Sequence, residues 1–107
     1  MGVRAIAPSE LESSLRRGEE LVLVDVRETL ELAICRIEGS RHLQLSEFPL
    51  RARELDPARP TVCICHHGIR SAIAAAALAA LGFERVFNLS GGIDRWAEEI
   101  DPRMARY

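Results

Sequence analysis

One stretch of the sequence, residues 61–81, constrains the fold more than any other. Thr61-Val-Cys-Ile-Cys65 is short, apolar and contains β-branched residues, which is typical of a strand buried on both faces of a parallel sheet. The polar residues His66-His-Gly68 follow at once. The residues Ser71–Leu81 are then strong helix formers, and Gly82 ends them. The sequence therefore predicts a strand, a tight loop and a helix in direct succession.

Strand-like and helix-like segments alternate along the rest of the chain, with turn residues between them. This alternation predicts an α/β fold of stacked layers. Further strands are expected at Arg4–Ile6, Leu21–Asp25, His42–Leu45 and Arg85–Leu89. Further helices are expected from a capping box at Ser9–Glu12 to Arg17, over Glu28–Ile34, from Ser46 to Leu55 and over Ile93–Ile100.

Length and charge limit the possible functions. The chain has 107 residues, the size of one domain, so residues 1–107 are expected to form a single unit. Its formal net charge is -2 and it contains no lysine, which leaves no strongly basic surface for nucleic acid or anionic lipid. The first residues lack a signal-peptide pattern, and the longest apolar run, Ala72–Leu81, is about half a membrane span. We expect a soluble, cytoplasmic protein without nucleic-acid or membrane partners.

Cys65 is the candidate nucleophile. It ends a predicted buried strand and precedes a glycine-containing loop and a helix, so loop amides and the helix N-terminus are expected to converge on its sulfur. Such an arrangement of donors stabilises a negative charge, and Arg70 at the start of the helix adds a positive charge. Since the thiolate is the reactive form of cysteine, chemistry is predicted at Cys65. The alternative is an inert buried thiol.

The other cysteines and the histidines have structural interpretations. Cys63 is expected to fill the core and Cys35 to be a packing residue, both as free thiols in a reducing compartment. His42 is also expected to be structural. A metal site would have to use the closely spaced side chains of Cys63, Cys65, His66 and His67. Such neighbours rarely satisfy tetrahedral geometry, so neither a metal nor an organic cofactor is expected.

Several residues are predicted to support the site or the core. Asp25 and Arg27 end a strand at the same sheet edge, and we hypothesise that they form a buried ion pair that holds the loop. Ser71 is expected to cap the helix that follows the loop. The alanines at 74–77 are explained by a helix lying close to the sheet, and Trp96 is expected in the core. Residues 103–107 show no pattern, and their tyrosine is expected to pack on the body.

Five separated stretches, taken together and in order, resemble the rhodanese family. They are Asp25-Val-Arg27-Glu28, Arg36-Ile-Glu-Gly-Ser40, Cys65-His-His-Gly-Ile-Arg70-Ser71, Gly82-Phe83 with Val86-Phe-Asn-Leu89, and Gly91-Gly-Ile93 with Trp96. The resemblance covers nearly the whole chain, and the ordered set is far more specific than any one stretch. It implies a single-domain fold with a mostly parallel, five-stranded sheet flanked by helices on both faces.

The resemblance also implies a reaction. In the family, the residue that matches Cys65 takes a sulfane sulfur from a donor such as thiosulfate, forms a persulfide and passes the outer sulfur to cyanide or a thiol. The family's active-site loop, whose amides hold the substrate or the persulfide, then corresponds to His66, His67, Gly68, Ile69 and Arg70. Many loops that prefer thiosulfate carry basic side chains directly after the cysteine, whereas histidines, charged only in part at neutral pH, follow Cys65 here.

We therefore predict a sulfurtransferase with Cys65 as nucleophile, a small-molecule sulfur donor and a cyanide or thiol acceptor; an acceptor protein is a further candidate. One alternative is a non-enzymatic persulfide carrier or regulatory module. A second is a phosphatase or arsenate reductase of the Cdc25 type. The resemblance disfavours the second because those relatives have a longer Cys-x5-Arg loop, whereas Cys65 and Arg70 form a Cys-x4-Arg loop.

Overall fold

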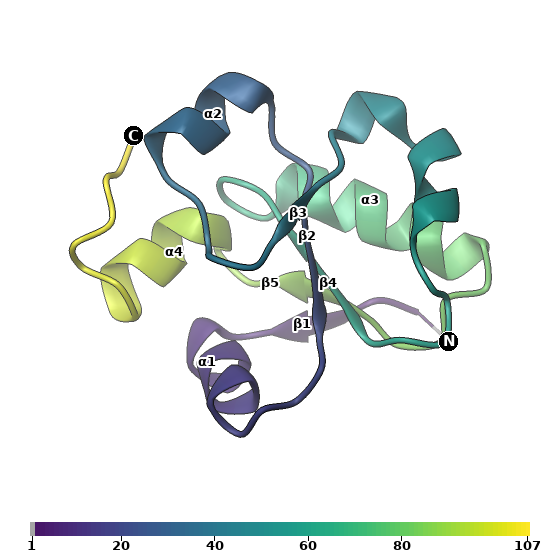
Figure 1. Ribbon diagram of the computed structural model, residues 1–107, viewed down its shortest axis with the longest axis horizontal. Coiled ribbons are helices and arrows are strands. Elements are labelled where there is room, and N and C mark those ends of the chain that lie inside the picture. Colours follow the sequence, from purple (N-terminus) through teal and green to yellow (C-terminus); the bar gives the residue numbers. More distant parts are fainter. Residues whose placement is uncertain (1) are drawn as a thin grey trace.

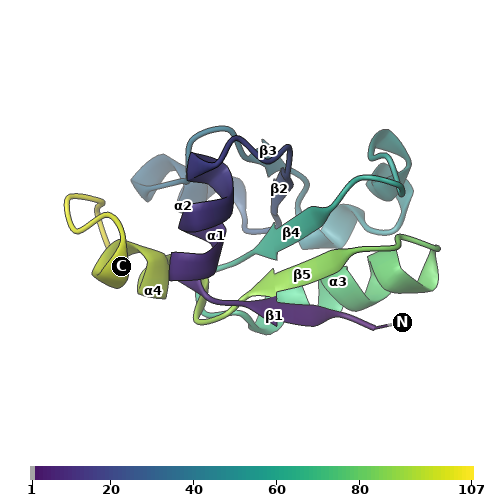
Figure 2. The same cartoon turned by 90° about the horizontal axis from the view of Figure 1, so that it is seen from below.

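A computed structural model describes residues 2–107 as a five-stranded, all-parallel sheet in the order β1-β5-β4-β2-β3. The arrows of β4, β5 and β1 point the same way in Figure 2. The expected parallel α/β fold is confirmed. The strands are β1 (Arg4–Ile6), β2 (Val22–Asp25), β3 (Arg41–His42), β4 (Thr61–Ile64) and β5 (Val86–Leu89).

Helices cover both faces of the sheet, as expected (Figure 1). Leu11 of α1 and Trp96 of α4 pack with Val62 and Ile64 on one face. Leu78 of α3 packs with residues of the short 3-10 turns on the other face. The helices are α1 (Pro8–Arg16), α2 (Thr29–Ile34), α3 (Ile69–Ala80) and α4 (Gly92–Glu99), and the 3-10 turns are η1 (Leu45–Glu47) and η2 (Leu50–Glu54).

The central strand β4 is buried on both faces because its side chains alternate between two cores. Val62 and Ile64 belong to the cluster under α1 and α4, while Cys63 and Cys65 belong to the cluster under α3. Its register with β2 pairs Asp25 with Ile64. The carboxyl ends of the two strands therefore lie side by side, and the loop that begins at Cys65 starts next to the end of β2.

The small residues of α3 bring this helix close to the sheet. Ala74, Ala75 and Leu78 are fully buried, whereas Ala76 is exposed. Because protein interiors are closely packed, a larger side chain at Ala75 would have to displace its neighbours. The expected close approach of the helix to the sheet is therefore seen at Ala74 and Ala75. Trp96 lies in the core, as expected.

Some boundaries differ from those predicted. The first helix begins at Pro8 rather than at a Ser9 cap, and the carboxylate of Glu10 accepts a hydrogen bond from the Ala7 amide at 2.8 Å. The strand expected at 42–45 covers only residues 41–42. The segment expected to be one helix from residue 46 to 55 consists of two 3-10 turns, because Pro49 has no amide hydrogen to continue a helix.

Two further expectations concern membranes and cysteines. Within residues 2–107, every helix is too short or too polar to cross a bilayer. Cys35, Cys63 and Cys65 are all free thiols, as predicted.

The contact between α3 and the sheet gives a stability prediction. Ala75→Leu should lower the free energy of unfolding by about 1–3 kcal/mol, because added methylenes must displace a closely packed interface. Ala76→Leu is the matched control, since it adds the same atoms on the exposed side of the same turn and should change stability by less than about 0.5 kcal/mol. Urea denaturation of both variants measures the difference, and equal losses would contradict a close helix-to-sheet contact.

Candidate active site

Cys65 lies directly after β4, at the start of the loop that leads into α3. Its Sγ atom accepts a hydrogen bond from the Gly68 amide at 3.0 Å and one from the Ser71 hydroxyl at 3.2 Å. Gly68 is the residue before α3, so the N-terminus of this helix faces the sulfur. Hydrogen-bond donors and the positive end of a helix favour an anionic sulfur. Residue 65 is only 1% exposed, so the surrounding residues almost completely enclose it.

The structure corrects the role expected for Ser71. Its hydroxyl does not cap α3; Ser71 is fully buried and contacts Cys65 Sγ and the side-chain oxygen of Asn88. The helix begins earlier than predicted, at Ile69, which places Ser71 inside the first turn. The serine therefore serves the cysteine rather than the helix end.

Asn88 is a site residue that sequence reasoning missed. It lies on β5 and its amide nitrogen donates to the Gly68 carbonyl at 3.0 Å, while its amide oxygen accepts from the Ser71 hydroxyl. Asn88 thus fixes two of the groups around the sulfur. A polar side chain within the apolar strand Val86–Leu89 was the available signal, because buried polar groups need partners.

Gly92, at the start of α4, holds the other side of the loop. The first amides after it donate to the loop, from Ile93 to the Cys65 carbonyl at 2.8 Å and from Asp94 to the His66 carbonyl at 3.1 Å. A Cβ atom on Gly92 would overlap both carbonyl oxygens, and the residue has a φ of +63°. Only glycine allows α4 to approach so closely. The loop consequently lies between α2 and α4 (Figure 1).

Cys63 is a poor nucleophile in this position. It is fully buried on the α3 side of the sheet. Burial, with a smaller contribution from Cys65, raises the pKa of Cys63 to about 12, so its thiol stays neutral at physiological pH. Cys35 is half-buried and packs against the α1 and α4 side. Both match the structural interpretations made for them.

Arg70 does not present a free charge to the loop. Its guanidinium binds both carboxylate oxygens of Glu31 on α2, at 2.6 and 2.8 Å. The hydrogen bond from Arg70, helped by one from Tyr107, lowers the pKa of Glu31 to about 2 despite partial burial. The carboxylate is therefore charged at neutral pH. Sequence reasoning missed Glu31, because nothing local indicates a partner 39 positions away.

Asp25 and Arg27 form the buried ion pair that their positions predicted. Arg27 Nη2 lies 2.7 Å from the Asp25 carboxylate, and both side chains are almost fully buried. In the described residues, however, the hydrogen bonds of Arg27 run to α2, Cys35 and Tyr107 rather than to the loop. The pair therefore supports the loop through its neighbours and not by direct contact. His42 contacts the Arg27 carbonyl, in keeping with a structural role.

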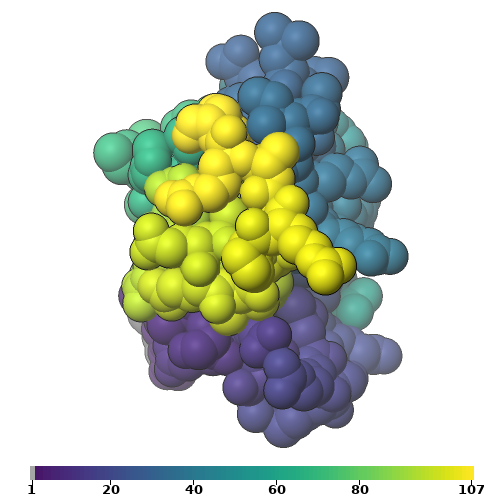
Figure 3. Space-filling model, turned by 90° about the vertical axis from the view of Figure 1, so that its left-hand side faces the viewer, coloured from purple at the N-terminus to yellow at the C-terminus, as the bar shows by residue number. Residues whose placement is uncertain are grey.

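The C-terminal residues cover the loop. The Tyr107 ring stacks on the His66 ring at 3.8 Å, and its hydroxyl donates to Glu31 and accepts from Arg27. Burial and the bond to Glu31 raise the pKa of Tyr107 to about 12, so the phenol keeps its proton. In Figure 3 the C-terminal segment lies across the molecule between α4 and α2. Tyr107 thus packs on the body as expected, and specifically on the candidate site.

A cluster of possible metal ligands differs from the one considered in the sequence. His66, His67 and Asp94 offer ligand atoms within 4.8 Å of one another, without either strand cysteine. Arg106 binds Asp94 at 3.0 Å, and His66 Nε2 lies 2.9 Å from the Tyr107 carbonyl. Competing partners therefore occupy two of the three groups, and the absence of a metal remains a prediction. The side chains of His67 and Ile69 are both exposed.

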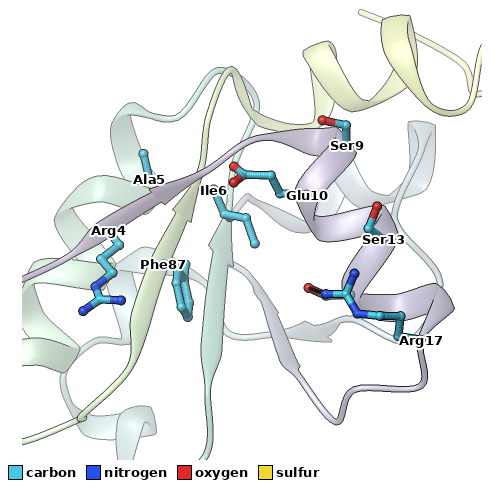
Figure 4. Close-up of a pocket in the computed structure, with 9 residues that line it drawn as sticks. Arg4, Ala5, Ile6, Ser9, Glu10, Ser13, Arg17 and Phe87 are labelled. Carbon is cyan, nitrogen blue, oxygen red and sulfur yellow. Dashed lines mark hydrogen bonds between the residues drawn. The ribbon is translucent and has the colours of Figure 1, made fainter.

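Two of the surface hollows differ in their position relative to the cysteine. One, of about 550 Å³, lies at the sheet edge between β1 and α1, away from the cysteine (Figure 4). A second, of about 270 Å³, borders the candidate site. It is lined by Val26, Glu28, Gln44, Leu45, Ser46 and Arg70. A small anion that approaches this hollow meets Arg70.

The ion pair at the end of β2 gives a second stability prediction. Asp25→Asn should cost about 3–5 kcal/mol in the free energy of unfolding, because it leaves the buried Arg27 guanidinium without its counter-ion. Glu54→Gln removes a carboxylate from an exposed pair with Arg51 and should cost less than about 1 kcal/mol. Urea denaturation measures the free energy of unfolding of both variants. Similar small losses would show that the buried pair stabilises the fold no more than the exposed pair does.

The close approach at Gly92 gives a third prediction. Gly92→Ala should destabilise the protein by roughly 3 kcal/mol or more, because its methyl group meets backbone as well as adopting a strained φ. Gly82→Ala is the control: its φ is +96°, but nothing lies within 4 Å of its Cβ position, so it should cost about 1–2 kcal/mol. Thermal or urea unfolding that gave equal losses would rule out the steric argument.

Comparison with known proteins agrees with this geometry. The rhodanese-like domain family matches residues 7–99. Thiosulfate sulfurtransferase GlpE of Pseudomonas fluorescens is 40% identical over 96% of this chain and 93% of its own. The probable adenylyltransferase/sulfurtransferase MoeZ of Mycobacterium tuberculosis is 36% identical over 95% of this chain, which spans only 26% of its length. A rhodanese-related protein of Thermoplasma volcanium superposes with a TM-score of 0.82 at 33% identity, covering 91% of this chain and 93% of that one. The chain belongs to the family of rhodanese-like domains.

Proposed function

We propose that this protein is a sulfurtransferase that uses Cys65 as its nucleophile and thiosulfate as a donor. The Cys65 thiolate attacks the outer sulfur of thiosulfate, the S–S bond of the donor breaks, and sulfite leaves with the bonding electron pair. A persulfide then remains on Cys65. Cyanide or a thiolate attacks its outer sulfur in a second step and releases the cysteine as thiolate.

The observation that supports this proposal most directly is the set of donors on one sulfur. The Gly68 amide and the Ser71 hydroxyl both donate to Cys65 Sγ. These groups stabilise negative charge on the thiolate before the reaction and on the persulfide after it. The similarity to a protein named thiosulfate sulfurtransferase supports the choice of donor. Three free thiols suit a reducing compartment such as the cytoplasm.

The size of the loop favours sulfur over phosphate chemistry. From Cys65 to Arg70 the loop has six residues, and Gly68 folds back so that its amide reaches the sulfur at 3.0 Å. Asn88 and the start of α4 hold the loop in this tight form. A tetrahedral phosphate needs a wider ring of amides, so hydrolysis of phosphate esters is not expected.

Replacement of the cysteines tests the proposal. Cys65→Ser should reduce thiocyanate formation from thiosulfate and cyanide by at least ~10³-fold, because an alcohol cannot carry the transferred sulfur. Cys63→Ala is the matched control two residues earlier on the same chain segment. It should keep kcat/KM within about twofold and lose only about 1 kcal/mol of stability.

Three results would contradict the proposal. Full activity in Cys65→Ser would remove the assigned nucleophile. A single turnover without further cycles in the native protein, at saturating cyanide, would show a persulfide carrier instead of an enzyme. Cleavage of an aryl phosphate that is lost in Cys65→Ser would point to the phosphatase alternative.

A further inference from the structure

The charged side chains around the loop compensate one another. Each arginine that borders the site binds a carboxylate, and the pairs are Arg70 with Glu31, Arg27 with Asp25, and Arg106 with Asp94. Each of these three arginines is paired, and Glu28, which lines the adjacent hollow, adds a further carboxylate. His66 and His67 add positive charge only when they are protonated. The attraction for an anionic donor therefore comes mainly from hydrogen-bond donors and the α3 dipole.

Glu31 is held in place by donors on both of its oxygens. Oε1 accepts from Arg70 at 2.6 Å and from the Glu28 amide at 3.1 Å. Oε2 accepts from Arg70 at 2.8 Å and from the Tyr107 hydroxyl at 2.6 Å. The side chain is only 18% exposed. The carboxylate is consequently fixed beside Arg70 and cannot swing away from an incoming anion without breaking several charge-assisted bonds.

Arg70 lies where an anionic donor that enters the hollow beside the loop would meet it, although its guanidinium is paired with Glu31. It lies in the first turn of α3, directly after the loop that begins at Cys65, and it lines the hollow next to the site. Any anion that binds Arg70 therefore approaches the Glu31 carboxylate as well. The repulsion grows in proportion to the charge of the anion.

We propose that Glu31 is a specificity-determining residue, which disfavours doubly charged sulfur donors relative to singly charged donors that react at the same kind of bond. This inference rests on the proposed function. The preferred donor class is then a monoanionic sulfane compound, such as a thiosulfonate or a persulfide, and thiosulfate is accepted with a penalty. The Glu31 carboxylate acts by electrostatic repulsion of the bound donor and forms no bond with it.

A pair of donors isolates the charge effect. Thiosulfate is a dianion, and its reaction with the Cys65 thiolate gives the persulfide and sulfite. Methanethiosulfonate is a monoanion, and its reaction with the same thiolate gives the same persulfide and methanesulfinate. In both reactions the thiolate attacks the outer sulfur, and the leaving group departs with the electron pair of the broken S–S bond. The total charge is conserved in each case.

The test measures kcat/KM for both donors in Glu31→Gln, which keeps the shape of the side chain and removes its charge. We expect a rise of about tenfold for thiosulfate and about threefold for methanethiosulfonate, since Coulomb energy scales with donor charge. Glu20→Gln is the matched control, because it removes the same charge from an exposed position before the amino end of β2. It should leave both values within about 1.5-fold.

Two outcomes in Glu31→Gln would overturn the inference. One is an equal change for the two donors in either direction, which would make Glu31 a support for Arg70 and nothing more. The other is a thiosulfate value that stays unchanged or falls.

The dependence of kcat/KM on ionic strength in the native protein tests the inference without any substitution. With compensated charges, kcat/KM for thiosulfate should change less than about twofold between about 0.02 and 0.5 M ionic strength. A fall of about fivefold or more would show a net positive site and overturn the inference.

Failure of this inference differs from failure of the proposed function. If methanethiosulfonate forms a persulfide on Cys65 of the native protein, the sulfurtransferase chemistry stands whatever Glu31 does. If neither donor forms one, the proposed function itself fails. The ratio of the two donors' kcat/KM values, by contrast, depends only on the discrimination assigned to Glu31.

Discussion

The buried ion pair of Asp25 and Arg27 is the interaction on which the arrangement of the site depends. A guanidinium that is 0% exposed is tolerated only when its donors are satisfied. Arg27 donates to the Asp25 carboxylate, to the Cys35 carbonyl and to the Tyr107 hydroxyl. These bonds join the end of β2, the segment after α2 and the C-terminal residues. With α2 fixed in this way, Glu31 can reach Arg70.

A second set of contacts places the sulfur. Asn88 from β5 and the amides that follow Gly92 bind the loop from two sides. The N-terminus of α3 faces the sulfur of Cys65. Asn88 belongs to β5 and the amides of Ile93 and Asp94 belong to α4, so elements of the packed layers set the position of the loop. Such pre-organisation is what a charge-stabilising site requires, since donors already in place need not reorganise during the reaction.

The fold was predictable from local patterns, and much of the site was not. The buried strand, the loop with Gly68 and the helix after it are readable from residues 61–82, because apolar runs and glycine constrain the backbone locally. Asp25 and Arg27 were also correctly paired, since they are two positions apart at a strand end. The packing of Cys63 in the core follows from the alternation of side chains along the same strand.

The missing parts are contacts between distant positions. Glu31 reaches Arg70 across 39 positions, and Tyr107 reaches Glu31 across 76. Arg70 was expected to offer a free charge because only its own segment was considered. Ser71 was assigned to the helix end because the start of α3 was placed two residues too late. These errors share one cause: the partner of a polar side chain is set by tertiary packing, which local sequence does not specify.

The most direct test of this account is to locate the transferred sulfur by mass. The native protein is mixed with an equal amount of thiosulfate, digested without reductant, and its peptides are fragmented. A gain of about 32 Da is expected on Cys65 alone, because only this sulfur accepts hydrogen bonds from the loop and the start of α3. A gain on Cys63 or Cys35, or release of sulfite with no gain on any cysteine, would contradict it.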